Sequence, residues 1–122
     1  MAVVLIVEDE APILFLAECF LQEVGYQTLT ASTLAEAQAV INSDKRIDAV
    51  FTDVNLGNDH EGGLHVGQIA ARTRPKIPMI YTSGRGLTDG MKALFVEPSS
   101  FLPKPYTNNQ LVDALTRHLR VG

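Results

Sequence analysis

Cysteine is nearly missing from this sequence. Its 122 residues include one, Cys19, which excludes an internal disulfide framework and favours a reducing, cytoplasmic setting. Cys19 falls on the apolar face of a predicted helix, where we expect a buried structural thiol rather than a nucleophile.

An excess of basic residues is missing as well. Lys and Arg total 10 against 14 Asp and Glu, which gives a formal net charge of −4, and the basic residues are scattered. Binding to nucleic acid normally needs clustered positive charge, so no direct contact with nucleic acid is expected. The apolar residues 2–7 have no basic leader and give way at once to acidic residues, so we expect neither a signal peptide nor a membrane span.

Common catalytic arrangements are also missing. There is no Ser-His or Cys-His pair for nucleophilic catalysis and no GxxxxGK[ST] loop to hold a nucleotide. The three histidines, His60, His65 and His118, share no metal-ligand spacing and are expected at the surface or in loops.

The hydrophobic pattern predicts strands that alternate with helices. Hydrophobic residues make up 46% of a chain that has no linker or repeat, so we expect one domain over residues 1–122. Short apolar runs typical of buried parallel strands lie at 3–7, 27–31, 48–52, 78–82 and 99–102. The predicted fold class is α/β: a doubly wound (βα)5 sandwich around a five-stranded parallel sheet.

Helical spacing and capping residues predict the helices between these strands. Gly25 should end the first helix, and Thr33 with Glu36 and Thr107 with Gln110 should form capping boxes. Two further helices are expected near 63–73 and 87–96. The apolar stripe of the first helix comprises Ile13, Leu16, Ala17, Phe20, Leu21 and Val24.

Polar residues follow the predicted strands. Glu8 and Asp9 come after the first strand, Asp53 after the third, Ser83 after the fourth and Lys104 after the fifth. Carboxyl ends of parallel strands meet at the edge where α/β sheets bind ligands, so these residues should converge. For Glu8 and Asp9 alone, a favourable charge at a helix N-terminus would be a sufficient explanation.

The chemistry of this group favours phosphoryl transfer. Three carboxylates repel one another unless a cation neutralises them, and an all-oxygen cluster suits Mg²⁺. Lys104 would then bind an anion shared with the metal, and Ser83 could donate to another phosphoryl oxygen. With no other nucleophile present, Asp53 is the best candidate to form an aspartyl phosphate.

The stretch FLPKP sets Lys104 between Pro103 and Pro105, which restrict the backbone around it. Two prolines could simply end a strand beside a solvated lysine. The convergence of polar residues at the strand ends favours instead a lysine whose backbone is held so that its ammonium binds one ligand.

The stretches VLIVEDE, FTDVNLG, IPMIYTSG and FLPKPYT resemble, in order and spacing, the receiver domain of bacterial response regulators over essentially the whole chain. The resemblance implies a chemotaxis-receiver-like sheet of order 2-1-3-4-5. It also implies a signalling domain rather than a classical enzyme. Such a domain assists its own phosphorylation and dephosphorylation. Its partners would be a sensor histidine kinase or histidine phosphotransfer protein and a downstream protein.

The resemblance assigns roles residue by residue. Asp53 would be the phosphoacceptor, and Asp9 a metal ligand with Glu8 helping through water. The Asn55 backbone carbonyl would be a further ligand, and the Asn55 side chain would modulate the lifetime of the phosphate. Lys104 would contact the phosphoryl group, and the bond from Lys104 to Pro105, which is often cis in the family, would aim its side chain at the phosphate.

The resemblance also implies a switch. Ser83 would be the switch hydroxyl, and Arg85, two residues later, would hinder the attacking water. Phe101 would be the aromatic switch, expected to populate its inward rotamer even without phosphate, although simple core packing is the alternative. The surface of the fourth helix, fifth strand and fifth helix would change and bind a partner or a second copy.

The sequence departs from the family pattern in two places. Gly57 stands where the family usually has proline, and the 57–63 loop is enlarged by one or two residues. Residues 85–96 also match poorly, which leaves the extent of the fourth helix open.

Three other functions compete with this interpretation. A haloacid-dehalogenase-type phosphotransferase would carry its DxD motif on the first strand, and a nucleotide- or flavin-binding domain would need a glycine-rich turn there. A phosphate-independent interaction module would tend to lose one of the site residues. The chain could be a single-domain receiver or a piece of a hybrid kinase, and Met1 just ahead of the first strand favours the former.

Overall fold

Strands and helices alternate along the chain, as predicted. The computed structural model describes residues 1–119, and the last three residues of the predicted domain lie outside that range. The strands are β1 Val3–Val7, β2 Gln27–Ala31, β3 Ala49–Asp53, β4 Met79–Ser83 and β5 Ser99–Pro103. The helices are α1 Ala11–Glu23, α2 Leu34–Ile41, α3 Gly62–Thr73, α4 Asp89–Lys92 and α5 Asn108–His118.

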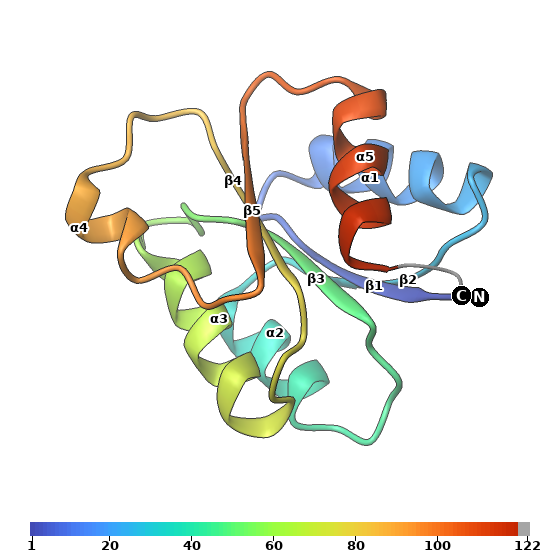
Figure 1. Ribbon diagram of the computed structural model, residues 1–122, viewed down its shortest axis with the longest axis horizontal. Coiled ribbons are helices and arrows are strands. Elements are labelled where there is room, and N and C mark those ends of the chain that lie inside the picture. The colour runs from blue at the N-terminus through green and yellow to red at the C-terminus, as the bar shows by residue number, and fades with distance from the viewer. Residues whose placement is uncertain (120–122) are drawn as a thin grey trace.

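The strands form one parallel sheet of order β2-β1-β3-β4-β5, which confirms the predicted fold. β1 lies between β2 and β3, with Leu5 opposite Leu29 on one side and Val50 on the other. In Figure 1, α1 and α5 cover one face of the sheet, and α2, α3 and α4 lie on the other. Within residues 1–119, no helix combines the length and apolar character needed to span a bilayer.

The sheet separates two apolar cores. Successive strand residues point to opposite faces, so Val4 packs toward α1 and α5 while Leu5 packs toward α2 and α3. Every residue of β1, β3 and β4 is buried, which explains the apolar run of β1 and the apolar first three residues of β3 and β4.

Three strands, β3, β4 and β5, end one residue later than predicted, and β3 and β4 also begin one residue later. Asp53 is the last residue of β3, opposite Thr82, and Ser83 is the last residue of β4, opposite Pro103. Their backbones therefore belong to the sheet, which holds both side chains more firmly than a loop would.

One of the two predicted capping boxes is complete. At α5, Thr107 accepts from the Gln110 backbone and the Gln110 side chain accepts from Thr107. At α2, Thr33 accepts from the Glu36 N–H at 3.1 Å, but the Glu36 carboxylate accepts from the Ser32 N–H and hydroxyl instead. The prediction of a capping box at Thr33 was therefore wrong in one of its two hydrogen bonds, the one from the Thr33 N–H to the Glu36 side chain.

The apolar stripe predicted for α1 is only partly buried. Leu21 is fully buried, but Leu16 is 67% exposed, and Val24 lies beyond the helix end and is also exposed. Cys19 is partly exposed rather than buried, which corrects the prediction made for it. A sequence pattern shows which residues share a face and not how much of that face another element covers.

The fourth helix is much shorter than the predicted 87–96. Thr88 caps it by accepting from the Met91 N–H at 3.0 Å, and the helix ends after four residues. Gly86 and Gly90 have low helix propensity. Beyond Lys92 the chain turns, and Phe95 stacks on Tyr81 of the core with ring centroids 4.2 Å apart.

Candidate functional site

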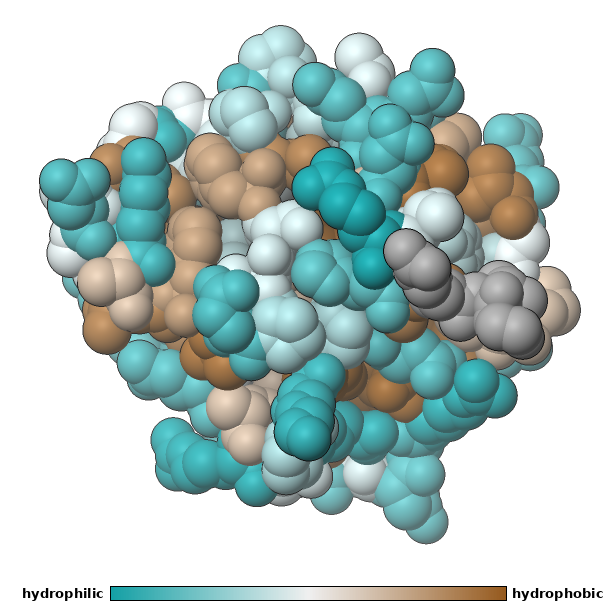
Figure 2. All heavy atoms as spheres, viewed as in Figure 1, coloured by the Kyte–Doolittle hydropathy of each residue, from teal (hydrophilic) through white to brown (hydrophobic). Residues whose placement is uncertain are grey.

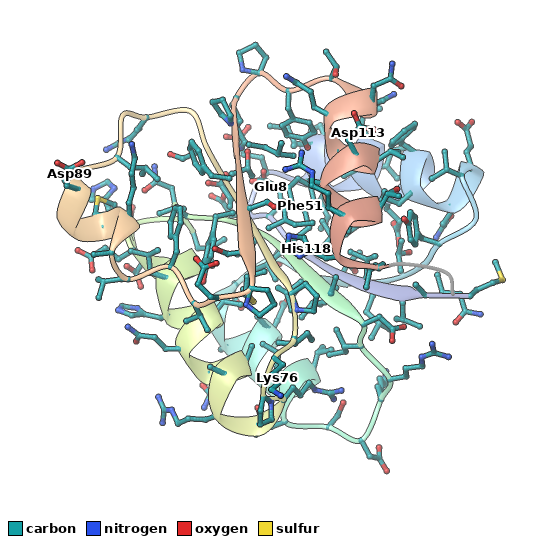
Figure 3. All side chains as sticks on the ribbon, viewed as in Figure 1. Glu8, Phe51, Lys76, Asp89, Asp113 and His118 are labelled. Atoms are coloured by element: carbon teal, nitrogen blue, oxygen red, sulfur yellow. The ribbon has the colours of Figure 1, made fainter. Side chains whose placement is uncertain are left out.

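Three carboxylates meet at the carboxyl ends of β1 and β3. Glu8 and Asp9 follow the last residue of β1, and Asp53 ends β3 next to it in the sheet. One oxygen atom from each of the three lies within 4.8 Å of the others. Glu8 and Asp53 are 5% and 7% exposed, and Asp9 is exposed. Figure 3 labels Glu8 at this edge of the sheet.

Lys104 completes the group from the end of β5. Its ammonium lies 2.6 Å from Asp53 Oδ2 and 3.0 Å from Glu8 Oε1. Its backbone N–H donates to the Ser83 carbonyl at 2.9 Å, and its bond to Pro105 is cis, as the resemblance implied. The FLPKP stretch thus places the ammonium against both buried carboxylates.

Burial and charge set the protonation of these groups. Burial raises the pKa of the Glu8 carboxyl to about 7, although hydrogen bonds from the Glu10 backbone and Lys104 oppose the rise. Burial also works against the Lys104 ammonium, but its hydrogen bonds to Asp53 and Glu8 outweigh that cost and raise the pKa of Lys104 above its ordinary value. Lys104 therefore stays charged at neutral pH.

The enlarged loop after β3 folds back onto the site. Leu56 and Asp59 exchange backbone hydrogen bonds of 2.9 and 3.0 Å, with Gly57 at a φ of 61° in the turn between them. The Gly57 N–H donates to Asp9 Oδ2 at 3.0 Å, and the Asn55 N–H donates to Asp53 Oδ1 at 3.0 Å. Gly57 thus supplies an N–H that a proline, which the resemblance implies at this position, would lack.

This donor set fits Mg²⁺. The atoms are all carboxylate oxygens, they lie close together, and Asp9 is open to solvent, so the ion could keep part of its water shell. Coulomb repulsion among the carboxylates would also fall when a divalent cation binds.

Ser83 ends β4, the strand next to β3, and Arg85 follows it by two residues. The buried Ser83 hydroxyl accepts from the Arg85 N–H at 3.1 Å and donates to the Arg85 carbonyl at 3.4 Å. With the amide oxygen of Asn55 facing Arg85, Asn55 accepts from Arg85 Nε at 3.2 Å and donates to the His60 carbonyl at 3.1 Å. Arg85 is therefore tied to the loop after β3, although the residue as a whole is exposed.

Phe101 lies away from the carboxylates, in the middle of β5. Its partly buried ring is 5.9 Å from that of Phe95, which stacks on Tyr81. The contact links Phe101 to the segment after α4. In the same view as Figure 1, Figure 2 shows hydrophobic side chains that reach the surface around α4.

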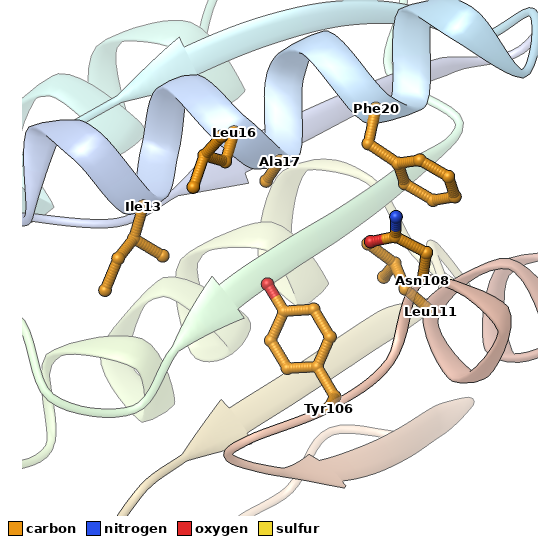
Figure 4. A pocket seen from close by; sticks show the side chains of 7 residues that line it. All are labelled: Ile13, Leu16, Ala17, Phe20, Tyr106, Asn108 and Leu111. Atoms are coloured by element: carbon orange, nitrogen blue, oxygen red, sulfur yellow. The ribbon is translucent and has the colours of Figure 1, made fainter.

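A pocket of about 190 Å³ opens between α1 and the start of α5 (Figure 4). The Tyr106 ring forms one side of it, and burial raises the pKa of the Tyr106 hydroxyl. Phe15 and Leu16, on the same helix as the pocket wall, are 63% and 67% exposed. The lining residues are Ile13, Leu16, Ala17, Phe20, Tyr106, Asn108 and Leu111.

Sequence reasoning missed Gly63 and did not predict the contact that Gly57 makes. Gly63, near the start of α3, lies so close to the backbone of β3 that a Cβ there would overlap the Asp53 carbonyl and come within 2.7 Å of Val54 Cα. Gly57 supplies the N–H that binds Asp9. The glycines in GNDHEGG were the available signal, but spacing alone does not show what a glycine lies against.

The parallel sheet and the acidic group facing a lysine define the class of receiver domains. The family model for the response regulator receiver domain matches residues 4–116, so the chain belongs to this family. The nitrogen assimilation regulatory protein NtrX of Azorhizobium caulinodans is 31% identical over 117 residues, which are 95% of this chain and 26% of that protein. The chain thus spans about a quarter of the length of such relatives.

Solved structures agree with the family assignment. A response regulator receiver protein from Sinorhizobium medicae is 29% identical, with a TM-score of 0.89 over 98% of this chain and 95% of that one. The receiver domain of a Pseudomonas aeruginosa sensor histidine kinase has a TM-score of 0.81 at 20% identity, covers 96% of both chains, and is described with a magnesium ion coordinated in its active-site cleft. That second likeness shows the fold alone.

Proposed function

We propose that this chain is a phosphorylation-dependent switch of a two-component system, in which Asp53 accepts a phosphoryl group from a histidine kinase or histidine phosphotransfer protein. The main support is the position of the Asp53 carboxylate, which is buried, ends a strand, and lies 2.6 Å from Lys104. We also propose that the single domain covers residues 1–122, is cytoplasmic, and makes no direct contact with nucleic acid, although relatives include transcriptional regulators.

Each site residue has a task in the transfer. A carboxylate oxygen of Asp53 attacks phosphorus while the bond from phosphorus to the donor nitrogen breaks, which leaves an acyl phosphate. Mg²⁺ held by Glu8, Asp9, Asp53 and the Asn55 carbonyl would supply positive charge against the phosphoryl oxygens. Lys104 exchanges its bond to Asp53 Oδ2 for one to a phosphoryl oxygen, and the Ser83 hydroxyl exchanges its donation to the Arg85 carbonyl for a donation to another. Water later attacks phosphorus and releases inorganic phosphate.

The direct test is exposure to Mg²⁺ and acetyl phosphate followed by mass spectrometry of the intact chain. A mass increase that survives acid and is lost in base would identify an acyl phosphate. Without Mg²⁺ the increase should be greatly reduced. No increase under either condition would favour a phosphate-independent interaction module.

Asp9→Asn should weaken Mg²⁺ binding by at least about tenfold, because it removes a ligand charge. The new amide oxygen can still accept from Gly57, so the loop after β3 should keep its place. A titration followed by amide chemical shifts measures the affinity. Glu10→Gln, which removes the next acidic charge along the chain, serves as the control, and equal losses in the two variants would argue against Asp9 as a ligand.

Arg85→Ala should shorten the lifetime of the phosphorylated protein severalfold. Arg85 lies two residues after Ser83, and its bond to Asn55 holds it beside the site, where its guanidinium can obstruct water. The decay of the mass increase measures the lifetime. Lys92→Ala controls for loss of a positive charge from the same segment, and an unchanged lifetime in Arg85→Ala would contradict the proposed role.

The phosphodonor protein must dock close to Asp53. The exposed Phe15 and Leu16 on α1, with the pocket beside Tyr106, form an apolar surface on the helix that starts directly after the acidic pair. We propose that the donor binds this surface.

The readout surface is proposed to be that of α4, β5 and α5. Withdrawal of Ser83 toward the phosphate would open space that Phe101 fills, and a downstream protein or a second copy would bind the altered surface. The alternative is that Phe101 is only a core residue. Beryllofluoride mimics the phosphoryl group. If it changed amide chemical shifts only around the three carboxylates and not near Phe101, the result would support that alternative.

A further inference from the structure

The segment that joins β4 to β5 packs against the core through side chains that are only partly buried, Leu87, Met91, Phe95 and Val96. It contains α4, which has four residues, none of them buried. Figure 1 shows α4 at the edge of the molecule, on the other side of β5 from α5, and Figure 3 labels its first residue, Asp89, at that edge. An element with no fully buried residue gains limited stability from packing, so its position also depends on how its two ends are held.

Two hydroxyls of β4 hold those ends. Ser83 accepts from the Arg85 N–H, before α4, and Tyr81 accepts from the Val96 N–H at 3.0 Å, after α4. The two side chains are two residues apart on one strand, so they lie on the same face of the sheet. The Ser83 hydroxyl is at the carboxylate site, whereas the Tyr81 hydroxyl is inside the core.

Tyr81 is tightly fixed. Its residue is fully buried, and its ring stacks on Phe95 with an interplanar angle of 10°. Gly67 of α3 makes room for the hydroxyl, because a Cβ at that position would overlap its oxygen. The glycine thus allows a tyrosine to reach from the strand, past α3, to the backbone of Val96.

We propose that Tyr81 is a positioning residue for the readout surface, and this inference rests on the proposed function. When phosphorylation draws Ser83 away from Arg85, the start of the segment is released while its end stays hydrogen-bonded to Tyr81. The segment then moves about Phe95 and Val96 as a hinge and does not detach. Phe101 contacts Phe95, so the movement is passed to β5.

The first test needs no phosphoryl group. Tyr81→Phe removes one hydroxyl and keeps the stacked ring, so hydrogen exchange at the Val96 amide should become about fivefold faster. Tyr26→Phe, a partly buried tyrosine on the other face of the sheet, is the control and should leave that rate unchanged. Equal exchange at Val96 in wild type and Tyr81→Phe would refute the hydrogen bond and the inference with it.

The second test measures coupling with beryllofluoride. In the wild type, amide shifts should extend from Ser83 through residues 85–101. In Tyr81→Phe they should persist at residues 85–92 but fall by at least half at 97–101. Gly67→Ala, which displaces the same hydroxyl, should give the same pattern. Shifts at 97–101 as large as in the wild type in both variants would overturn the inference.

The control for the proposed function is in the same spectra. The amides of Glu8, Asp9 and Asp53 should shift in every variant, because none of the changes touches the carboxylates. If they do not shift even in the wild type, the proposed function fails and the coupling with it. The exchange rate at Val96 then still reports whether the hydrogen bond exists.

Discussion

Asp53→Asn should abolish the gain in mass with acetyl phosphate and Mg²⁺. An amide is not a nucleophile toward phosphorus, so no acyl phosphate can form at this position. Glu8 cannot readily replace it, because burial raises the pKa of that carboxyl to about 7, so that a large share of it carries a proton at neutral pH. Intact mass spectrometry measures the loss, and peptide mapping of the wild type should place the label on Asp53.

The variant should keep its fold, so that the loss can be assigned to chemistry. The amide oxygen that replaces the carboxylate can still accept from the Asn55 N–H, and Lys104 keeps its ion pair with Glu8. Removing one of two facing carboxylates also relieves repulsion, so the melting temperature should stay within about 4 °C of the wild type. Asp113→Asn, on the exposed side of α5, is the matched control. Undiminished labelling in Asp53→Asn would place the phosphoacceptor elsewhere.

The sequence was a good guide to the sheet and to the residues at its edge. Buried parallel strands need continuous apolar runs, and polar residues that follow such runs must lie at one edge, so Glu8, Asp53 and Lys104 could be brought together without coordinates. The order of the strands in the sheet could not be predicted from the residues in the same way, because the spacing of strands along the chain does not determine it. The correct order came from the resemblance to receiver domains.

Tertiary contacts decided what the sequence could not. The 87–96 region has apolar residues at helical spacing, but Phe95 and Val96 are held by Tyr81, and the helix ends early. Leu16 fits the stripe of α1 and is nevertheless exposed, because no element covers it among residues 1–119. Burial depends on the neighbouring element, which no local pattern contains.

Gly63→Ala should destabilise the protein strongly. The added Cβ would overlap the Asp53 carbonyl and approach Val54 Cα to 2.7 Å, and both neighbours are backbone atoms at the end of a central strand that cannot rotate away. Overpacking of this kind costs about 3 kcal/mol. For a domain of this size the melting temperature should fall by roughly 10 °C. Thermal unfolding followed by circular dichroism measures the change.

The same substitution should slow phosphorylation, because the atoms displaced belong to the residue that accepts the phosphoryl group. Gly63 also donates its N–H to the Val54 carbonyl at 2.8 Å. To make room for the new Cβ, α3 must either shift the end of β3 with it or break this hydrogen bond. Gly86→Ala is the matched control. Its Cβ would meet nothing within 4 Å, and a glycine replaced without strain should leave stability equal or slightly higher. If Gly63→Ala had the same melting temperature as Gly86→Ala and was phosphorylated at the same rate, α3 would not be the support that holds Asp53 in place.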